Sequence, residues 1–302
     1  MTYVAAPDLG VAVAYFAPRP SSARRSRFDR FIAPIRASHA ALRIAELVLE
    51  GNEPELTDSP DVVRVPARDA LWQKERLLSV AVAALPSSIT KVAWLDADVL
   101  FEDLDWMPKT SHALDAAPVV QPFSRVVHLG RDGEFTAPIE SYAAVFARDP
   151  SARRTGRFDA HGHTGHAWAA RRDLVTRHGL FDACIAGGAD HVMAHAFTGD
   201  HDVACLDRVL DRGPQRAHYL RWAESMTRDA GTLGVVEGTL SHLWHGDLAS
   251  RRYVERYEML REHAFDPARD LERRGETWSI APNADARLRP WLDAYFASRV
   301  DD

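Results

Sequence analysis

The sequence contains little cysteine, little lysine and no long apolar run, and each shortage excludes a class of protein. Its 302 residues include two cysteines, Cys184 and Cys205, which excludes a small disulfide-stabilised scaffold. No apolar run approaches the roughly 18 to 20 residues that a membrane-spanning helix requires. We therefore expect a globular chain without a membrane span, while peripheral association with a membrane stays open.

The net charge is small for this length. The chain has 43 acidic and 37 basic residues, of which 3 are lysine, for a formal charge of −6. A nucleic-acid partner usually requires a concentrated basic surface, so we expect none. We interpret the excess of arginine as compositional bias.

The two cysteines bear on compartment and on metal binding. The segment MTYVAAPDLG lacks the basic and apolar stretches of an export signal, so we expect reduced thiols and a cytoplasmic protein. Two cysteines without a Cys-x-x-Cys spacing cannot build a structural zinc site alone, although histidines could complete one.

The first half of the chain alternates short apolar runs with longer amphipathic ones, which predicts an α/β fold with a mostly parallel sheet. We expect strands over 11–17, 62–65, 91–95 and 119–123, helices over 71–85, 111–116 and 171–178, with 166–170 leading into the last of these, a strand or helix end over 44–49, and a mobile loop over 148–165. The expected organisation is a domain over 1–248 with a helical C-terminal extension over 249–302 packed on it.

Three Asp-x-Asp pairs occur, about the number that chance gives in a chain with 28 aspartates. Only Asp96 and Asp98 follow directly on an apolar strand, KVAWL. Ligands of open α/β sheets bind beyond the carboxyl ends of the strands, and a hard divalent cation can join carboxylates to a diphosphate. This pair therefore suggests a site for a nucleotide diphosphate and a metal ion, with an acidic helix-capping turn as the alternative.

Three later segments, together with the Asp96 strand, resemble the GT-A-fold nucleotide-sugar glycosyltransferases. The segment 166–182, HAWAARRDLVTRHGLFD, is similar to the segment before the catalytic acid in family 2 and β-1,4-galactosyltransferase-like enzymes. Gly187-Gly188-Ala189-Asp190 resembles their Gly-Gly-Glu-Asp, with Ala189 in the place of Glu. Leu243-Trp244-His245-Gly246 resembles the segment with the late metal-binding histidine, and no Gln-x-x-Arg-Trp signature of processive synthases occurs.

This resemblance implies a GT-A-like mixed sheet flanked by helices and a metal-dependent transfer of sugar. The donor would be a nucleotide sugar, with UDP favoured, and the acceptor a hydroxyl group of a carbohydrate or another molecule. Asp98 and His245 would bind the metal, and Asp96 either the metal or the ribose. One imidazole among oxygen ligands favours Mn²⁺, with Mg²⁺ as the alternative. Asp190 would deprotonate the acceptor with inversion at the sugar carbon, or else simply cap a helix.

Other residues have weaker claims to the site. Arg76 could reach the diphosphate, and Glu46 could bind the base if its segment is a strand, with a salt-bridged surface position as the alternative for each. Trp168 and Trp244 could stack on a sugar or lie in the core.

Four arginines of one segment could close over phosphates or remain in a solvated loop. They are Arg19, Arg24, Arg25 and Arg27.

Two further functions stay open. His161, His163 and His166 approximate the HxHxDH motif of metallo-β-lactamase-like hydrolases, although Gly165 stands in place of the aspartate. A catalytically silent module that binds nucleotides or carbohydrates could share the same fold.

Overall fold

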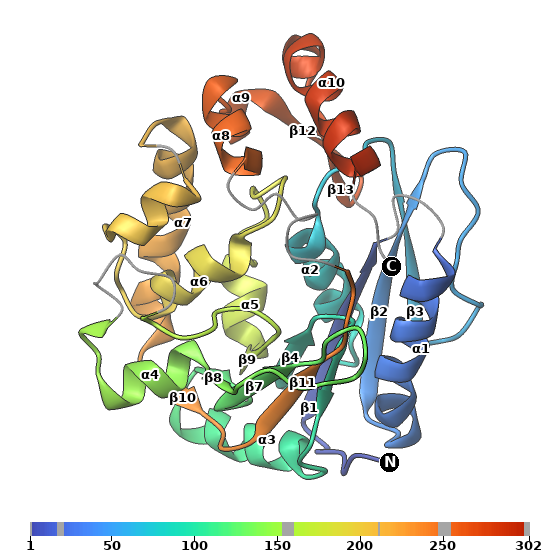
Figure 1. The fold of residues 1–302 in the computed structure, drawn as a ribbon, viewed down its shortest axis with the longest axis vertical. Helices are drawn as coiled ribbons and strands as arrows, with labels where there is room; N and C mark the ends of the chain where they lie inside the picture. Colours follow the sequence, from blue (N-terminus) through green and yellow to red (C-terminus); the bar gives the residue numbers. More distant parts are fainter. Residues whose placement is uncertain (1, 17–20, 153–159, 211, 247–254, 299–302) are drawn as a thin grey trace.

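The predicted α/β fold is confirmed. The computed structural model describes residues 2–16, 21–152, 160–210, 212–246 and 255–298. These residues form a mixed, mostly parallel sheet with helices packed on both of its faces (Figure 1). Within these ranges, no helix is long and apolar enough to cross a membrane.

The central sheet has seven strands among the described residues, in the order β10-β6-β9-β4-β1-β2-β3. Strand β9 runs antiparallel to both of its neighbours, and the other pairs are parallel. The segment at 44–49 belongs to a strand. The bounds are β1 Leu9–Phe16, β2 Ala41–Leu49, β3 Val62–Ala67, β4 Lys91–Leu95, β6 Val119–Gln121, β9 Ala167–Arg171 and β10 Leu233–Val235.

The strands are nearly continuous apolar runs because helices cover both faces of the sheet. Along β1, Val11 and Val13 pack on the face that holds Phe28 of α1, whereas Ala12 packs on the face that holds Leu77 of α2. Helices α1 and α3 cover the first face, and α2, α5, α6 and α7 cover the second. The helices are α1 Ser22–Ala37, α2 Lys74–Ala84, α3 Trp106–Ala116, α4 Tyr142–Arg148, α5 Arg172–His178, α6 Ala189–Phe197 and α7 Pro214–Ala230.

A smaller sheet of four described strands adjoins the end of β4. Its order is β5-β11-β7-β8. The strands are β5 Val99–Phe101, β7 Arg125–His128, β8 Ile139–Glu140 and β11 Thr239–His242. Because β5 begins three residues after Asp96, this sheet brings residues of β7 and β11 to the carboxyl end of β4.

The predicted C-terminal extension contains a β-hairpin as well as helices. Helices α8 (Glu255–Glu262), α9 (Pro267–Asp270) and α10 (Pro282–Ser298) flank a hairpin of β12 (Leu271–Arg274) and β13 (Thr277–Ile280). The hairpin is anchored on the segment before α2, because Trp278 N–H donates to Gln73 and Ile280 N–H donates to Asp69. The extension therefore packs beside the N-terminus of α2.

Candidate active site

A cavity of about 860 Å³ lies beyond the carboxyl end of β4. Asp96 and Asp98 follow this strand and line the cavity, as does Asp190. Six basic and four acidic side chains line it, although the whole chain is acidic. The basic ones are Lys74, Arg24, Arg27, Arg208, Arg256 and Arg261. This excess of positive charge suits an anionic ligand.

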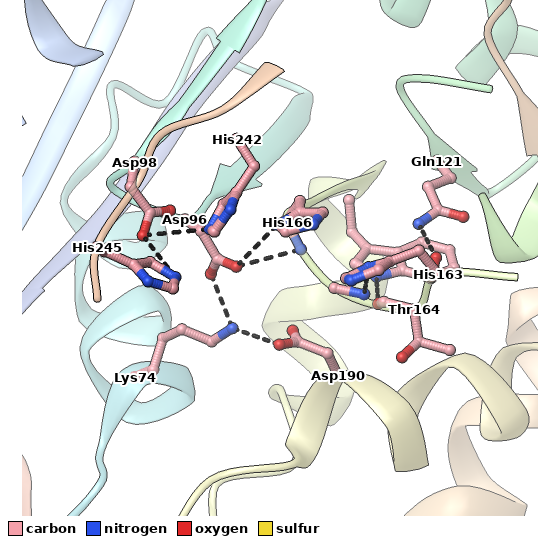
Figure 2. A network of polar contacts seen from close by, with 12 residues as sticks. Lys74, Asp96, Asp98, Gln121, His163, Thr164, His166, Asp190, His242 and His245 are labelled. Atoms are coloured by element: carbon pink, nitrogen blue, oxygen red, sulfur yellow. Dashed lines mark hydrogen bonds and ion pairs between the residues drawn. The ribbon is translucent and has the colours of Figure 1, made fainter. Parts of the chain in front are cut away.

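Lys74 joins two of the predicted carboxylates. Its Nζ lies 2.9 Å from Oδ1 of Asp96 and 2.6 Å from Oδ2 of Asp190 (Figure 2). The other oxygen of Asp96, Oδ2, accepts the backbone N–H of His166 at 3.1 Å. Residues 74, 96, 166 and 190 thus come from four separate elements and share one hydrogen-bonded network.

Burial and charge shift the pKa values of this network. Burial raises the pKa of Asp96 to about 6, Lys74 opposes the shift, and repulsion from Asp190 and Asp98 adds to it. Burial disfavours the charged form of Lys74, but Asp190 and Asp96 raise its pKa well above the usual value. Lys74 is therefore a cation at neutral pH.

Asp98 lies beside two imidazoles. Its Oδ2 is 3.5 Å from Nε2 of His242 and 3.7 Å from Nε2 of His245. The three ligand atoms lie within 4.8 Å of one another and face the cavity (Figure 2). Two imidazoles and a carboxylate, with space on one side, suit a divalent transition-metal ion that keeps positions open for a ligand.

Backbone pairing brings these residues together from distant parts of the chain. Strand β11 pairs with β5, which places His242 opposite Val99. Just beyond the strand, Leu243 N–H donates to the Asp98 carbonyl at 2.8 Å. His245 follows two residues after Leu243, and its Nε2 lies 3.7 Å from Oδ2 of Asp98.

A second group of imidazoles adjoins the first. His128, His163 and His166 offer ligand atoms within 4.8 Å of one another, and the His166 ring lies 4.6 Å from that of His242. Burial lowers the pKa of His128 to about 4 and that of His163 to about 3, with nearby imidazoles adding to both shifts. Both are neutral at pH 7, the form that binds metal ions.

Asp190 is not the cap of its helix. Gly188 occupies the N-cap position of α6, and Asp190 is the second helical residue. Gly187 and Gly188 have φ values of +94° and +96°, and a Cβ at Gly188 would lie 2.3 Å from the Tyr257 hydroxyl. Glycine is therefore required to turn the chain here, and the turn directs Asp190 toward Lys74.

Arg76 and Glu46 lie away from the cavity. Arg76 forms ion pairs with Glu276 and Asp182, because it is two residues and about 200° around α2 from Lys74. The buried carboxylate of Glu46 accepts the N–H groups of residues 55 and 56, at 2.6 and 2.9 Å. These contacts support the surface ion pair at Arg76 and a loop-holding role for Glu46.

The predicted sugar-stacking tryptophan Trp168 lies in the core. It is fully buried on β9, packs against Phe197 of α6, and donates its indole N–H to the Thr164 carbonyl. Strand β9 is covered on both faces, so no side of this ring is open to a sugar. Trp244 is half-buried and is not among the lining residues, whereas Trp72 lines the cavity.

The structure divides the predicted arginine cluster. Arg24 and Arg27 line the cavity from α1. Arg25 forms an ion pair with Asp29 on the same helix. Arg19 lies outside the described residues.

The histidine-rich segment does not form one site. His163 and His166 face the cavity, whereas His161 belongs to a separate buried group with His191, His195 and Cys205. Gly162, between His161 and His163, has a φ of +76°, and the imidazoles on its two sides belong to different groups. The predicted mobile loop over 148–165 overlaps this segment, and its residues 153–159 lie outside the described ranges.

Sequence reasoning did not identify Lys74, His242 or His128 as site residues. Lys74 stands in the same QKER run as Arg76, and His242 stands three residues before His245 in HLWH. The His-x-x-His spacing was a usable signal for His242. The role of Lys74 was not readable, because its partner Asp190 is 116 residues away in sequence.

Comparison with solved structures finds distant similarities to this chain. The catalytic domain of Drosophila β-1,4-galactosyltransferase 7 in complex with xylobiose is 12% identical over 94% of this chain and 98% of its own, with a TM-score of 0.41. A mutant of that enzyme in complex with manganese, UDP-Gal and xylobiose gives the same score at 11% identity, with the same shares covered. Glucosyl-3-phosphoglycerate synthase of M. tuberculosis is 14% identical over 91% of this chain and 88% of its own, with a TM-score of 0.39.

No protein-family model matches the sequence, and no curated protein sequence matches it. Likeness at these identities and TM-scores carries no conclusion about activity. The residues of the cavity have to support any function by themselves.

Proposed function

We propose that this chain is a metal-dependent glycosyltransferase that takes a sugar from a nucleotide-sugar donor, with UDP-linked donors favoured, and transfers it to a hydroxyl acceptor. The observation that carries the proposal is the presence of two different functional groups in one cavity. One is the Asp98–His242–His245 group, and the other is the carboxylate of Asp190 held by Lys74. The Asp98 group suits a cation that binds a diphosphate, and the Asp190 carboxylate suits removal of a proton from the acceptor hydroxyl.

The donor diphosphate is expected beside Asp98. Carboxylates repel phosphates, so a cation on Asp98, His242 and His245 is needed to hold the diphosphate there. Two imidazoles in the donor set favour Mn²⁺ over Mg²⁺. When bound, the cation would stabilise the negative charge on the departing nucleoside diphosphate as a Lewis acid. Arg24 and Arg27 on α1 line the same cavity and would add positive charge toward the donor.

Asp190 is the proposed general base. Its Oδ2 is hydrogen-bonded to Lys74, which leaves Oδ1 for the acceptor hydroxyl. As the acceptor oxygen bonds to the anomeric carbon, the bond from that carbon to the diphosphate oxygen breaks and the hydroxyl proton passes to Asp190. Displacement in one step inverts the anomeric configuration.

Lys74 is a positioning residue in this scheme. It holds Asp190 and Asp96 at 2.6 and 2.9 Å and lies half-buried beside Glu75. Its positive charge lowers the pKa of Asp96 against the effect of burial, and so favours the ionised form that a ribose or metal ligand requires. Asp96 would then bind the ribose hydroxyls or the cation.

The proposal is tested by screening nucleotide sugars with Mn²⁺, measuring thermal stabilisation and nucleotide release. A ligand that binds only the folded chain raises its melting temperature. We expect stabilisation by UDP with Mn²⁺ in the parent and its loss in Asp98→Ala and His245→Ala. Asp105→Ala and His112→Ala change exposed residues of the same types and serve as controls. Binding of UDP and Mn²⁺ by the two site variants at the parent's affinity would exclude the site.

A second candidate function is hydrolysis of the same kind of donor. The group of His128, His163 and His166 beside Asp98 favours it, since this group offers ligands for a second cation. Hydrolysis predicts sugar release that no acceptor accelerates and that His163→Ala abolishes. A silent binding module predicts metal-dependent donor binding without any turnover.

A further inference from the structure

A third group of metal-ligand side chains lies in the interior, apart from the Asp98 group and the His128 group. Side chains of His161, His191, His195 and Cys205 offer ligand atoms that all lie within 4.8 Å of one another. All four residues are buried, and His195 and Cys205 are 0% exposed. Three imidazoles and a thiol in one buried cluster are a costly arrangement for a core, because each polar group must find a partner there.

The local structure explains how the four residues meet. His191 and His195 are four residues apart on α6, so both imidazoles project from one face of the helix. Cys205 lies on the 3-10 helix at Ala204–Arg208 that follows α6. His161 arrives from the loop before β9, where the positive φ of Gly162 turns the chain.

Hydrogen bonds outside the cluster orient two of the imidazoles toward it. Nδ1 of His161 lies 2.9 Å from the Gly162 carbonyl, which can only accept, so Nδ1 carries the proton and Nε2 carries the lone pair. Nε2 of His195 lies 3.2 Å from the Cys205 sulfur, while its Nδ1 lies 3.5 Å from the Tyr142 hydroxyl. Histidines that bind metals generally direct their second nitrogen to such an outer partner.

We propose that His161, His191, His195 and Cys205 bind a structural zinc ion. A tetrahedral N₃S site has ligand atoms about 3.3 to 3.6 Å apart, from Zn–N of about 2.05 Å and Zn–S of about 2.3 Å. The contact between His195 and Cys205, at 3.2 Å, is within about half an ångström of this spacing, and the whole set reaches it by shifts of about an ångström. Zinc enters as Zn²⁺ and the Cys205 thiol gives up its proton to solvent. The thiolate selects zinc over Mn²⁺ and Mg²⁺, which prefer oxygen ligands.

The ion would fix the elements that carry the candidate active site. His191 directly follows Asp190 on α6, and His161 lies two residues before His163 at the cavity. Arg208, at the end of the 3-10 helix with Cys205, lines the cavity too. Four protein ligands leave no open position, so the role is structural rather than catalytic. This site does not depend on the proposed transfer reaction.

The test uses the full chain and metals alone. After the Asp98 group is disabled by Asp98→Ala with His245→Ala, we expect about one equivalent of zinc to copurify with the chain. Replacement of zinc by Co²⁺ should give the intense thiolate-to-cobalt charge-transfer absorption of a tetrahedral site. Cys205→Ser should lose this absorption, and Cys184→Ser, which changes the other buried cysteine, should keep it.

A Co²⁺-bound chain without thiolate charge transfer would overturn the proposal, as would a chain that binds no Co²⁺ or zinc. Loss of the absorption in Cys184→Ser but not in Cys205→Ser would overturn it as well. If Cys205→Ser fails to fold, the spectrum of the parent with Cys184→Ser decides the ligand, because Cys205 is then the only thiol in the sequence. Transfer activity has no part in these measurements, so failure of the proposed function leaves them valid.

Discussion

Replacement of Asp190 by asparagine separates a catalytic role from a structural one. The substitution keeps the size of the side chain and leaves the cap of α6 unchanged, since Gly188 and not Asp190 occupies the N-cap position. The contact of 2.6 Å from Lys74 changes from an ion pair to a hydrogen bond with a neutral amide. Lys74 keeps its ion pair with Asp96 at 2.9 Å.

The expected losses differ greatly between folding and catalysis. A hydrogen bond to a charged group contributes about 1.5–3 kcal/mol to stability. Because Lys74 keeps its contact with Asp96 and because Asp190 is partly exposed, the stability lost in Asp190→Asn lies at or below the lower end of this range. Loss of a general base lowers the rate by about 10²- to 10⁴-fold. Asp190→Asn should therefore melt only a few degrees below the parent, bind UDP and Mn²⁺ nearly normally, and transfer sugar at least about a hundredfold more slowly.

The assay compares nucleotide release with and without acceptor in the parent and the variant. Asp182→Asn is the matched control, because Asp182 is a similarly half-buried aspartate paired with Arg76 outside the cavity. Transfer by Asp190→Asn at the parent's rate would refute the assignment of the base. An equal fall in the Asp182→Asn control would show that the assay responds to stability alone.

Three further predictions concern the metal group, stereochemistry and pH. His242→Ala should weaken Mn²⁺-dependent UDP binding as much as His245→Ala, measured by calorimetry; normal binding would remove His242 from the ligand set. NMR of the product should show inversion at the anomeric carbon, and retention would exclude direct displacement by a hydroxyl that Asp190 deprotonates. Burial raises the pKa of Glu75 from an ordinary value of 4.5 to about 8, although the charge of Lys74 opposes this shift. The folded chain therefore binds the Glu75 proton more tightly than the unfolded chain does. The stability gained from this proton is present below pH 4.5 and is lost as the pH rises to about 8. The urea concentration at half-unfolding should therefore fall less steeply with pH over this range in Glu75→Gln than in the parent. An equal dependence on pH in the two proteins would contradict the shift.

Strand and helix types were largely readable from the sequence because apolar periodicity follows burial. The run KVAWL reads as a buried strand and is one, and its end places Asp96 and Asp98 at the cavity. The pattern at 44–49 was ambiguous between strand and helix, and pairing with β1 and β3 decides it. The hairpin of β12 and β13 was missed, since its four-residue strands are too short to show a period.

The composition of the site was less readable, because side-chain direction depends on tertiary contacts. We predicted that Arg76 of the QKER run binds phosphate, but Lys74 lines the cavity instead. Residues two positions apart on a helix point about 200° away from each other, so the two side chains lie on opposite faces of α2. Trp168 is closed to a sugar because β9 lies between β4 and β6 and helices pack over it, an arrangement that depends on tertiary structure. The separation of His161 from His163 depends on one backbone conformation, at Gly162.

The central claim is that one cavity binds a nucleotide diphosphate through a cation on Asp98, His242 and His245. Calorimetric titration of UDP into the chain, with and without Mn²⁺, tests it most directly. Cation and nucleotide that share a site must raise each other's affinity by the same factor. We predict tight UDP binding that requires Mn²⁺ in the parent and is lost in Asp98→Ala, with Asp105→Ala unchanged. UDP affinity that is the same with and without Mn²⁺, or that survives Asp98→Ala, would contradict the claim.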